Sequence, residues 1–412
     1  MQYPLLYGKR VVLGGINSLM MYSAYVHIPF CRHRCHYCDF NTLAGMEHLI
    51  PDYVSALIQE IRIVSNVHLK KPIQTIYFGG GTPSLIPANL YENMLTAFRR
   101  RFKLQEDCEI TIEANPGTLT EEYLKNLRKL GVNRISIGVQ STDTFDLTRL
   151  DRIHDINDIL NSIRFARIAG FENINLDMIF GLPWQDLLGW QHSLSRAISL
   201  KPDHFSLYSL VIESGTLLYH WHQQGLISLQ DQDLEGDMYQ CAMDMLADAG
   251  YEQYEISNWA KSDPQRSYQS RHNKQYWYNL PYFGFGAGAH GYIDGTRTVN
   301  VTTIPEYIQR INQRENSQLS HQASPAVNST TQVDHLTQMR DFMMLGLRLV
   351  QEGVSIERFQ ERYGRSLINV FEDEIQSLID RGIIEWTGEE KSRLRLSKRG
   401  VMIANQAFME FV

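Results

Sequence analysis

The sequence predicts an α/β protein, a partial (β/α)6 barrel followed by a small C-terminal α+β domain that is winged-helix-like. Between residues 22 and 210, six β-rich runs alternate with helical stretches and start about 25 to 50 residues apart, close to the size of one βαβ unit. Glycine-rich and polar residues follow several runs, as they do at the carboxyl ends of barrel strands. Near the C-terminal end, two amphipathic helices precede a hairpin-like pair of runs. These three observations predict the architecture.

The six predicted strands share an enrichment in β-branched and aromatic residues. They are Ala24–Ile28, Gln74–Phe78, Glu109–Glu113, Arg134–Val139, Asn173–Phe180 and Phe205–Leu210. The helices between them carry apolar residues at three- and four-residue spacing. They are Tyr53–Val64, Leu90–Phe102, Glu121–Leu130 and Ile156–Ile168. Such units build a parallel sheet with right-handed crossovers, curled or closed as a barrel, and a further helix, Asp233–Ala249, and strand, Tyr251–Ser257, follow.

Changes in composition divide the chain into five predicted parts. They are an N-terminal tail (1–20), the barrel (21–260), an aromatic and glycine-rich extension (261–312), a linker or exposed loop rich in Gln, Ser, Asn and Thr (313–333), and the C-terminal domain (334–412). The C-terminal domain holds two predicted helices and two predicted strands. These are Leu336–Val350, Ser366–Arg381, Ile383–Trp386 and Arg393–Leu396.

The composition excludes several classes of protein. Of the 412 residues, 43% are hydrophobic and 21% are charged, which excludes a disordered chain and a disulfide scaffold. No window approaches the roughly 18 to 20 apolar residues that a membrane span needs. The net charge of −7 argues against nucleic acid as the main partner. The one segment that imitates a targeting sequence, from Lys9 to Val26, is broken by Asn17 and has no evident cleavage site, so a cytoplasmic protein is expected.

Three of the five cysteines, Cys31, Cys35 and Cys38, fall within eight residues directly after the first predicted strand. Three thiolates at C-x3-C-x2-C spacing can hold three irons of a [4Fe-4S] cluster and leave the fourth iron open to a ligand. The alternative is a zinc site completed by His33 or His36, because Cys3His is a common structural set. The two isolated cysteines, Cys108 and Cys241, are expected to be small core residues.

A run of glycines, Gly79-Gly80-Gly81-Thr82-Pro83, follows the second predicted strand. Together with the cysteine loop after the first strand, it resembles the radical SAM superfamily. The resemblance implies that the three cysteines hold a [4Fe-4S] cluster whose open iron is chelated by the amino and carboxylate groups of S-adenosylmethionine. It also implies that the glycine run lies against that cofactor's ammonium group. We therefore expect Gly81→Val to weaken cofactor binding and to leave the cluster assembled.

The same resemblance assigns the remaining cofactor contacts to polar residues at or near the strand ends. The residues that it assigns to the cofactor are Tyr25, Tyr37, Gly80, Gly81, Thr82, Glu113, Gln140, Arg152 and Asp177. Each buried polar side chain among them needs a partner, and a bound polar cofactor would supply it. The alternatives are a surface ion pair for Arg152 and a core position for Tyr25.

Within the superfamily, the chain resembles the branch that holds oxygen-independent coproporphyrinogen oxidase and its heme-chaperone relative, the HemW type. The oxidase pattern has a further cysteine two places after the third, whereas here Asp39 and Phe40 follow Cys38. The run His272-Asn273-Lys-Gln-Tyr276-Trp277 matches the H-N-x-x-Y-W motif of the heme-binding relatives, in which an imidazole can ligate heme iron.

The match implies that His272 is a heme ligand. His290 is a second candidate, although its glycine-rich surroundings could equally mark a tight backbone crossing. The alternative for the whole motif is a hydrogen-bonded core patch.

The resemblance implies a heme chaperone that binds a [4Fe-4S] cluster, S-adenosylmethionine and heme and transfers heme to an acceptor protein. No catalytic residue and no oxidase activity are expected. One alternative is a true coproporphyrinogen oxidase that decarboxylates its substrate through a 5′-deoxyadenosyl radical. The other is a DNA-binding regulator, which has only a few basic residues near the C-terminus to support it. A transiently engaged membrane-protein acceptor and a homodimer are left open.

Overall fold

The computed structural model describes residues 21–313 and 324–412. The predicted tail, residues 1–20, and residues 314–323 of the predicted linker lie outside this range. No helix in the described ranges is long and apolar enough to cross a lipid bilayer.

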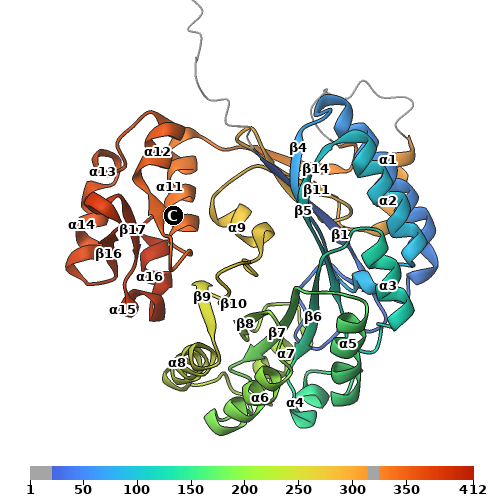
Figure 1. The fold of residues 1–412 in the computed structure, drawn as a ribbon, viewed down its shortest axis with the longest axis horizontal. Coiled ribbons are helices and arrows are strands. Elements are labelled where there is room, and N and C mark those ends of the chain that lie inside the picture. Colours follow the sequence, from blue (N-terminus) through green and yellow to red (C-terminus); the bar gives the residue numbers. More distant parts are fainter. Residues whose placement is uncertain (1–20, 314–323) are drawn as a thin grey trace, which may run out of the picture.

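Six parallel strands form the centre of the fold, and this confirms the predicted fold class (Figure 1). They lie side by side in chain order, and each pairs in parallel with the next. They are β1 (Tyr22–Ile28), β4 (Pro72–Gly80), β5 (Lys103–Ala114), β6 (Arg134–Gln140), β7 (Ile174–Phe180) and β8 (His204–Ser209). The register brings all six carboxyl ends to one edge of the sheet, where the predicted site residues were expected.

Helices cover the outer face of this sheet, as Figure 1 shows for α1, α2, α3 and α5. The four predicted helices are present as α1 (Ile50–Val67), α2 (Ala88–Arg101), α3 (Glu121–Lys129) and α5 (Ile156–Ile168). Two further helices, α4 (Thr144–Arg149) and α6 (Leu187–Ser199), were not predicted. Each begins after an aspartate whose side chain accepts backbone N–H groups of the first turn, Asp143 and Asp186, which is a start signal readable in the sequence.

The sheet stays open and is extended at both edges. Beyond β8 lie β10 (Asn258–Lys261) and β9 (Tyr251–Glu255). Beyond β1 lie β11 (Tyr282–Phe285), β12 (His290–Ile293), β13 (Thr296–Asn300) and β14 (Val327–Gln332). Because β11 pairs in parallel with β1, the predicted aromatic and glycine-rich extension is part of the main sheet.

Two features of this extended edge bear on the predictions. A Cβ atom on Gly284 would collide with the backbone carbonyl of His290, so the glycine-rich stretch does contain a tight backbone crossing. The predicted linker ends in β14, an exposed edge strand that pairs with β13. Its polar residues suit a strand whose side chains are mostly exposed.

A buried carboxylate, Glu60 on α1, ties that helix to the extended edge. It accepts hydrogen bonds from the Gly286 N–H (2.8 Å), the Asn300 side-chain amide (3.0 Å) and the hydroxyls of Tyr307 (2.6 Å) and Ser324. Burial raises the pKa of Glu60, and these four donors oppose that rise. The residue therefore joins segments that are far apart in the sequence.

We expect Glu60→Ala to lower the free energy of unfolding by about 3 to 5 kcal/mol, because it leaves several buried donors without an acceptor. Denaturant unfolding followed by circular dichroism measures the change. Arg62→Ala, an exposed position on the same helix, is the matched control and should change the stability by no more than about 0.5 kcal/mol. Equal changes in the free energy of unfolding for the two substitutions would contradict the role of Glu60 in joining these segments.

The C-terminal domain has its own apolar core and a three-stranded sheet. The predicted hairpin is present as β16 (Ile384–Thr387) and β17 (Arg393–Leu396), and β15 (Val354–Ser355) pairs with β17. Its helices are α11 (His335–Gly346), α12 (Ile356–Tyr363), α13 (Leu367–Val370), α14 (Glu372–Asp380), α15 (Lys398–Met402) and α16 (Ala404–Met409). The helix predicted from 366 to 381 is divided at Phe371, whose φ of −127° and ψ of 35° are not helical.

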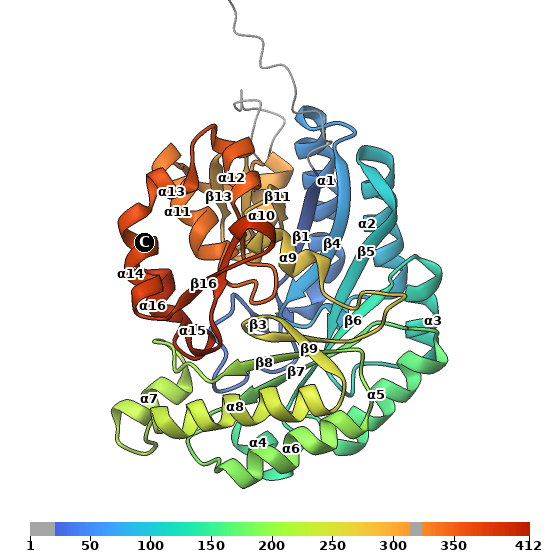
Figure 2. The same cartoon turned by 60° about the vertical axis from the view of Figure 1, so that its left-hand side comes forward.

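A short helix, α9 (Arg271–Trp277), lies between the C-terminal domain and the sheet (Figures 1 and 2). Lys274 forms an ion pair with Glu352 of the C-terminal domain, and Arg362 donates to the carbonyl of Asn279 at 2.6 Å. The remaining helices are α7 (Leu217–Gln223), α8 (Gln232–Asp248) and α10 (Ile304–Asn312).

Candidate functional site

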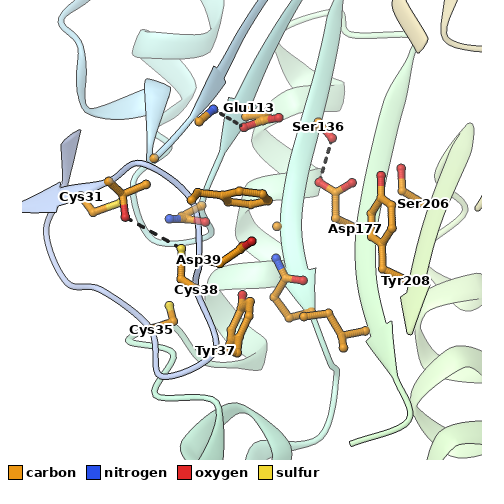
Figure 3. A pocket seen from close by; sticks show the side chains of 18 of the residues that line it. Cys31, Cys35, Tyr37, Cys38, Asp39, Glu113, Ser136, Asp177, Ser206 and Tyr208 are labelled. Atoms are coloured by element: carbon orange, nitrogen blue, oxygen red, sulfur yellow. Dashed lines mark hydrogen bonds between the residues drawn. The ribbon is translucent and has the colours of Figure 1, made fainter. Parts of the chain in front are cut away.

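A cavity of about 400 Å³ lies at the carboxyl ends of the parallel strands. Figure 3 shows Cys31, Cys35 and Cys38 on one side and Asp177 and Tyr208 on the other. The cavity brings together most of the predicted site residues. Those that line it are Cys31, Cys35, Tyr37, Cys38, Gly80, Gly81, Glu113, Gln140, Arg152 and Asp177.

All five cysteines are free, and three of them lie on the loop that follows β1. Each thiol of the loop has a polar neighbour. The Thr82 hydroxyl donates to the sulfur of Cys31 at 3.5 Å, the Arg152 guanidinium donates to that of Cys35 at 3.4 Å, and the Thr42 hydroxyl lies 3.8 Å from that of Cys38. Burial raises the pKa of the Cys31 and Cys38 thiols, whereas the hydrogen-bond donors oppose that rise and favour the thiolate, which is the form that binds iron. The donor set therefore fits an iron–sulfur cluster.

The two isolated cysteines have different surroundings. Cys108 is buried, as predicted, and burial raises the pKa of its thiol to about 12. Cys241 is half-buried on α8, with its sulfur 3.6 Å from that of Met245. Neither lies at the cavity.

The two histidines considered for a zinc site both face Asp151. His33 forms an ion pair with that carboxylate, and the Nε2 atom of His36 lies 2.9 Å from it. Within residues 21–313 and 324–412, no group of three or more Cys, His, Asp or Glu side chains is arranged to hold a single metal ion. Thiolates that bind different irons of a cluster lie farther apart than thiolates that bind one ion. A site for a single ion is therefore not what a cluster needs, and the [4Fe-4S] cluster remains a prediction.

The glycine run contacts the cysteine loop as well as the cavity, and this changes one expectation. A Cβ atom on Gly81 would lie 2.6 Å from the carbonyl oxygen of Phe30 and 3.0 Å from the sulfur of Cys31. A larger residue at Gly81 would therefore displace Cys31. This geometry favours a different expectation, in which Gly81→Val disturbs the cysteine loop as well as the cofactor contact.

Two carboxylates, Glu113 on β5 and Asp177 on β7, line the cavity. Glu113 accepts hydrogen bonds from the Tyr77 hydroxyl at 2.7 Å and from the Gly80 N–H at 2.9 Å. Burial raises the pKa of Glu113 to about 7, although both hydrogen bonds oppose the rise. Asp177 accepts from the Ser136 hydroxyl at 2.8 Å, and burial raises its pKa as well. Both acids are placed to receive a polar, positively charged group.

Arg152 is hydrogen-bonded inside the site, which differs from the surface ion pair considered for it. Besides the sulfur of Cys35, its guanidinium donates to the side-chain oxygen of Asn115 at 2.7 Å and to the carbonyl of Gly138 at 2.9 Å. Asn115 in turn donates to the Thr82 hydroxyl at 2.9 Å. This chain of contacts connects the ends of β5 and β6 to the cysteine loop.

Of the four remaining residues that were predicted to contact the cofactor, two line the cavity and two do not. The side chains of Gln140 and Tyr37 line the cavity, and Gln140 has a φ of +65°, which non-glycine residues adopt rarely and often at functional sites. Thr82 lies against Cys31 and is not part of the cavity wall. Tyr25 is also outside that wall. It is half-buried on β1, and its hydroxyl lies 2.9 Å from Nδ1 of His27.

Several polar residues that line the cavity were not predicted. They are Tyr77, Asn115, Arg134, Ser136, Asn175, Ser206 and Tyr208. A signal for them exists in the sequence, because side chains two residues apart on a strand face the same side. On β6, for example, the inward position of Gln140 implies that Gly138, Ser136 and Arg134 also face inward.

His272, the predicted heme ligand, is buried in α9 with 1% of its surface exposed. Its Nδ1 atom lies 2.7 Å from the Thr75 hydroxyl and its Nε2 atom 2.9 Å from the Tyr276 hydroxyl. Burial lowers the pKa of His272 to about 3, so the ring is neutral. This arrangement matches the hydrogen-bonded core patch, and a nitrogen becomes available to iron only when one hydrogen bond breaks. His290, the second candidate, is exposed on β12.

Comparisons with known proteins agree with this architecture. The family model described as the radical SAM superfamily matches residues 25–190, and that of the HemN C-terminal domain matches residues 333–403. The heme chaperone HemW of Bacillus subtilis is 40% identical over 95% of this chain and 99% of its own length. HemW of Lactococcus lactis is 34% identical over 95% and 97%. The structure of Escherichia coli coproporphyrinogen III oxidase (HemN) is similar in fold, with a TM-score of 0.78 at 21% identity, covering 95% of this chain and 89% of that one.

Proposed function

Since this chain belongs to the HemW family within the radical SAM superfamily, we propose that it is a heme chaperone. In this proposal it holds a [4Fe-4S] cluster and S-adenosylmethionine in the cavity, binds heme, and passes the heme to an acceptor protein. The observation that carries the proposal is the convergence of three free thiols and the polar strand ends on one cavity. The name of the 40% identical relative supports heme as the cargo.

In this proposal, Cys31, Cys35 and Cys38 are the cluster ligands. Such a cluster supplies an iron with an open coordination position. Thr82 and Arg152 stabilise the thiolates of Cys31 and Cys35 through the hydrogen bonds described above. The free state of all five thiols accords with a reducing compartment, and the proposal places the chain in the cytoplasm.

S-adenosylmethionine is the second cofactor of the proposal. Glu113 and Asp177 are its proposed electrostatic partners, because they are the two carboxylates that line the cavity from β5 and β7. Gln140, Arg152 and the Gly80 backbone add polar contacts at the same strand ends. The acceptor protein, including a membrane-bound one, and a homodimer belong to the proposal only as open possibilities.

The pKa of Glu113 gives a test of its role. A carboxyl group with a pKa near 7 is largely neutral at pH 6 and largely ionised at pH 8, and only the ionised form attracts an ammonium group. We expect S-adenosylmethionine to bind cluster-loaded protein several-fold more tightly at pH 8 than at pH 6, as measured by calorimetry. Glu113→Gln should bind weakly at both pH values. An equally pH-dependent affinity in Glu113→Gln would assign the effect to another group.

The function itself is tested with wild-type protein that has been reconstituted anaerobically and divided between heme and coproporphyrinogen. A chaperone should bind about one heme per chain with a distinct Soret band and should leave coproporphyrinogen unchanged. Product analysis by chromatography measures decarboxylation. Conversion of coproporphyrinogen would overturn the proposal in favour of the oxidase, whose pattern has a cysteine at the position of Phe40.

The predicted role of His272 has its own outcome in that experiment. If His272 ligates heme, His272→Ala should shift or abolish the Soret band while the absorption of the cluster persists. Trp277→Ala should weaken binding with less spectral change, because it removes an apolar contact and keeps the ligand. His290→Ala serves as the control at an exposed histidine. An unaltered spectrum and a lowered Tm in His272→Ala would refute ligation and leave the packing role that the hydrogen bonds describe.

A further inference from the structure

A buried arginine in the cavity forms no direct ion pair with the described residues. Arg134 on β6 lines the cavity with 2% of its surface exposed. Its Nε atom is buried without a hydrogen-bond partner in residues 21–313 and 324–412. None of the ion pairs found in those residues includes it. Buried charges in proteins are almost always paired, so this guanidinium is a candidate to bind a negatively charged ligand.

A second unpartnered group stands next to it. Thr111 on β5 is the register partner of Arg134, although it is not among the residues that line the cavity. The Oγ1 atom of Thr111 is buried and also has no hydrogen-bond partner in the part of the chain that the structure describes. Two adjacent unsatisfied groups are unusual, because most buried polar atoms are hydrogen-bonded. The unsatisfied guanidinium, which does line the cavity, therefore points to an acceptor that the described residues do not supply.

Two of the carboxylates that line the cavity, Glu113 and Asp177, accept hydrogen bonds from other residues. Glu113 is bound by Tyr77 and the Gly80 N–H, and Asp177 by Ser136 and the Asn175 amide at 2.8 Å. Burial raises the pKa of both acids and the charge of Arg134 opposes that rise, but neither acid forms a direct ion pair with Arg134. The two imidazoles that its field reaches, His204 and His272, are kept neutral by burial, which lowers the pKa of each. Arg134 therefore lacks a direct ion-pair partner among the described residues, and its Nε atom lacks an acceptor.

We propose that Arg134 binds a carboxylate group of a ligand that enters the cavity. A guanidinium fits a carboxylate with two parallel hydrogen bonds, which explains why an arginine suits this position. The two ligands of the proposed function both carry carboxylates, the methionyl group of S-adenosylmethionine and the propionates of heme. The assignment of the source rests on that proposed function.

The geometry favours a propionate. The Cα atoms of Arg134 and Gly138 are about 13 Å apart along β6 at the usual rise per residue. Gly138 is the residue whose carbonyl accepts from Arg152 beside Cys35. A carboxylate held at the cysteine loop lies at that end of the cavity, away from Arg134. Two exposed apolar residues that line the cavity, Phe40 (61% exposed) and Val211 (63%), offer contacts to an apolar macrocycle.

The first arm of the test needs neither heme nor cofactor. Sodium propionate is titrated into the wild type and into Arg134→Gln, and sodium chloride at equal ionic strength is the reference. A ligand that binds the folded state raises the Tm. We expect propionate to raise the Tm of the wild type above the chloride reference and to leave Arg134→Gln at that reference. An exposed position, Arg164→Gln, is the matched control and should respond as the wild type does.

The second arm identifies the source of the carboxylate. Heme is compared with heme dimethyl ester, and S-adenosylmethionine with its decarboxylated analogue, by spectroscopic and calorimetric titration. We expect wild-type protein to bind the diester at least tenfold more weakly than heme, and Arg134→Gln to bind the two equally. If only the decarboxylated cofactor shows an Arg134-dependent loss, the carboxylate is the methionyl one.

Each outcome of the two arms decides something different. If Arg134→Gln fails to fold, the propionate titration and the diester comparison on wild-type protein still test the proposal. Absence of any propionate effect, together with equal binding of each ligand and its carboxylate-free form, would show that water alone fills the site and would overturn it. Failure of wild-type protein to bind heme at all would refute the proposed function, whereas the propionate arm would still decide for or against the carboxylate site.

Discussion

Replacing any one of Cys31, Cys35 and Cys38 with alanine is expected to leave anaerobically reconstituted protein without its cluster, whereas the wild type should hold about four irons and four sulfides. The reason is that each cysteine supplies the only protein ligand to one iron, so the loss of one thiolate opens a second iron to solvent. The result is measured by iron and sulfide analysis and by the visible charge-transfer absorption of the cluster.

The controls are the two cysteines outside the cavity. Cys108→Ala removes a buried thiol and Cys241→Ala removes a half-buried one on α8, and neither thiol lines the cavity. Both variants should keep the full iron content. Stoichiometric zinc and no iron in the reconstituted wild type would refute the cluster assignment. That result would support the alternative of a zinc site completed by His33 or His36.

Gly81→Val is expected to lose the cluster and S-adenosylmethionine binding together. A branched side chain at this position would meet the Phe30 carbonyl and the Cys31 sulfur, which lie 2.6 and 3.0 Å from the site of its Cβ atom. Neither can yield easily, since Phe30 and Cys31 form the short strand β2 (Phe30–Cys31), which pairs with β3 (Leu43–Ala44). Iron content measured after reconstitution should fall below about a tenth of the wild-type value, because the first ligand of the cluster is displaced.

Gly236→Val is the matched control, because a Cβ atom there meets no atom within 4 Å and the residue lies in the helix α8. It should keep both the cluster and the cofactor affinity. Retention of a full cluster with weakened cofactor binding in Gly81→Val would restore the earlier expectation that this glycine faces only the cofactor.

The cysteine cluster and the strand-end residues were predictable because their signals are local. The spacing of Cys31, Cys35 and Cys38 on one loop limits how far apart the thiols can lie, whatever the rest of the fold does. Glu113, Gln140 and Asp177 end or lie on strands that were recognised from composition, and parallel strands place those ends at one edge. Local sequence signals are therefore enough to indicate the position of the candidate site, without knowledge of the tertiary contacts.

Other features depended on contacts between distant segments. The contact of Thr82 with Cys31 and the hydrogen bond between Arg152 and Asn115 each depend on which loops pack together. The alternation along β6 could have placed Arg134 on the inner face, but the absence of a partner among the described residues is a property of the assembled cavity. A sequence pattern shows which way a side chain points and does not show what it meets.

By itself, the sequence determined the fold class, the order of the central strands, and the loop that gathers three cysteines. These follow from hydrophobic periodicity and short spacings, which act over a few dozen residues. The tertiary structure alone decided that β11 pairs with β1, that Gly81 presses on the cysteine loop, and that α9 buries His272 with both ring nitrogens occupied. The physical reason is that these arrangements join segments up to about 260 residues apart, where burial and hydrogen-bond satisfaction across the whole core select the partner and local propensity carries no information.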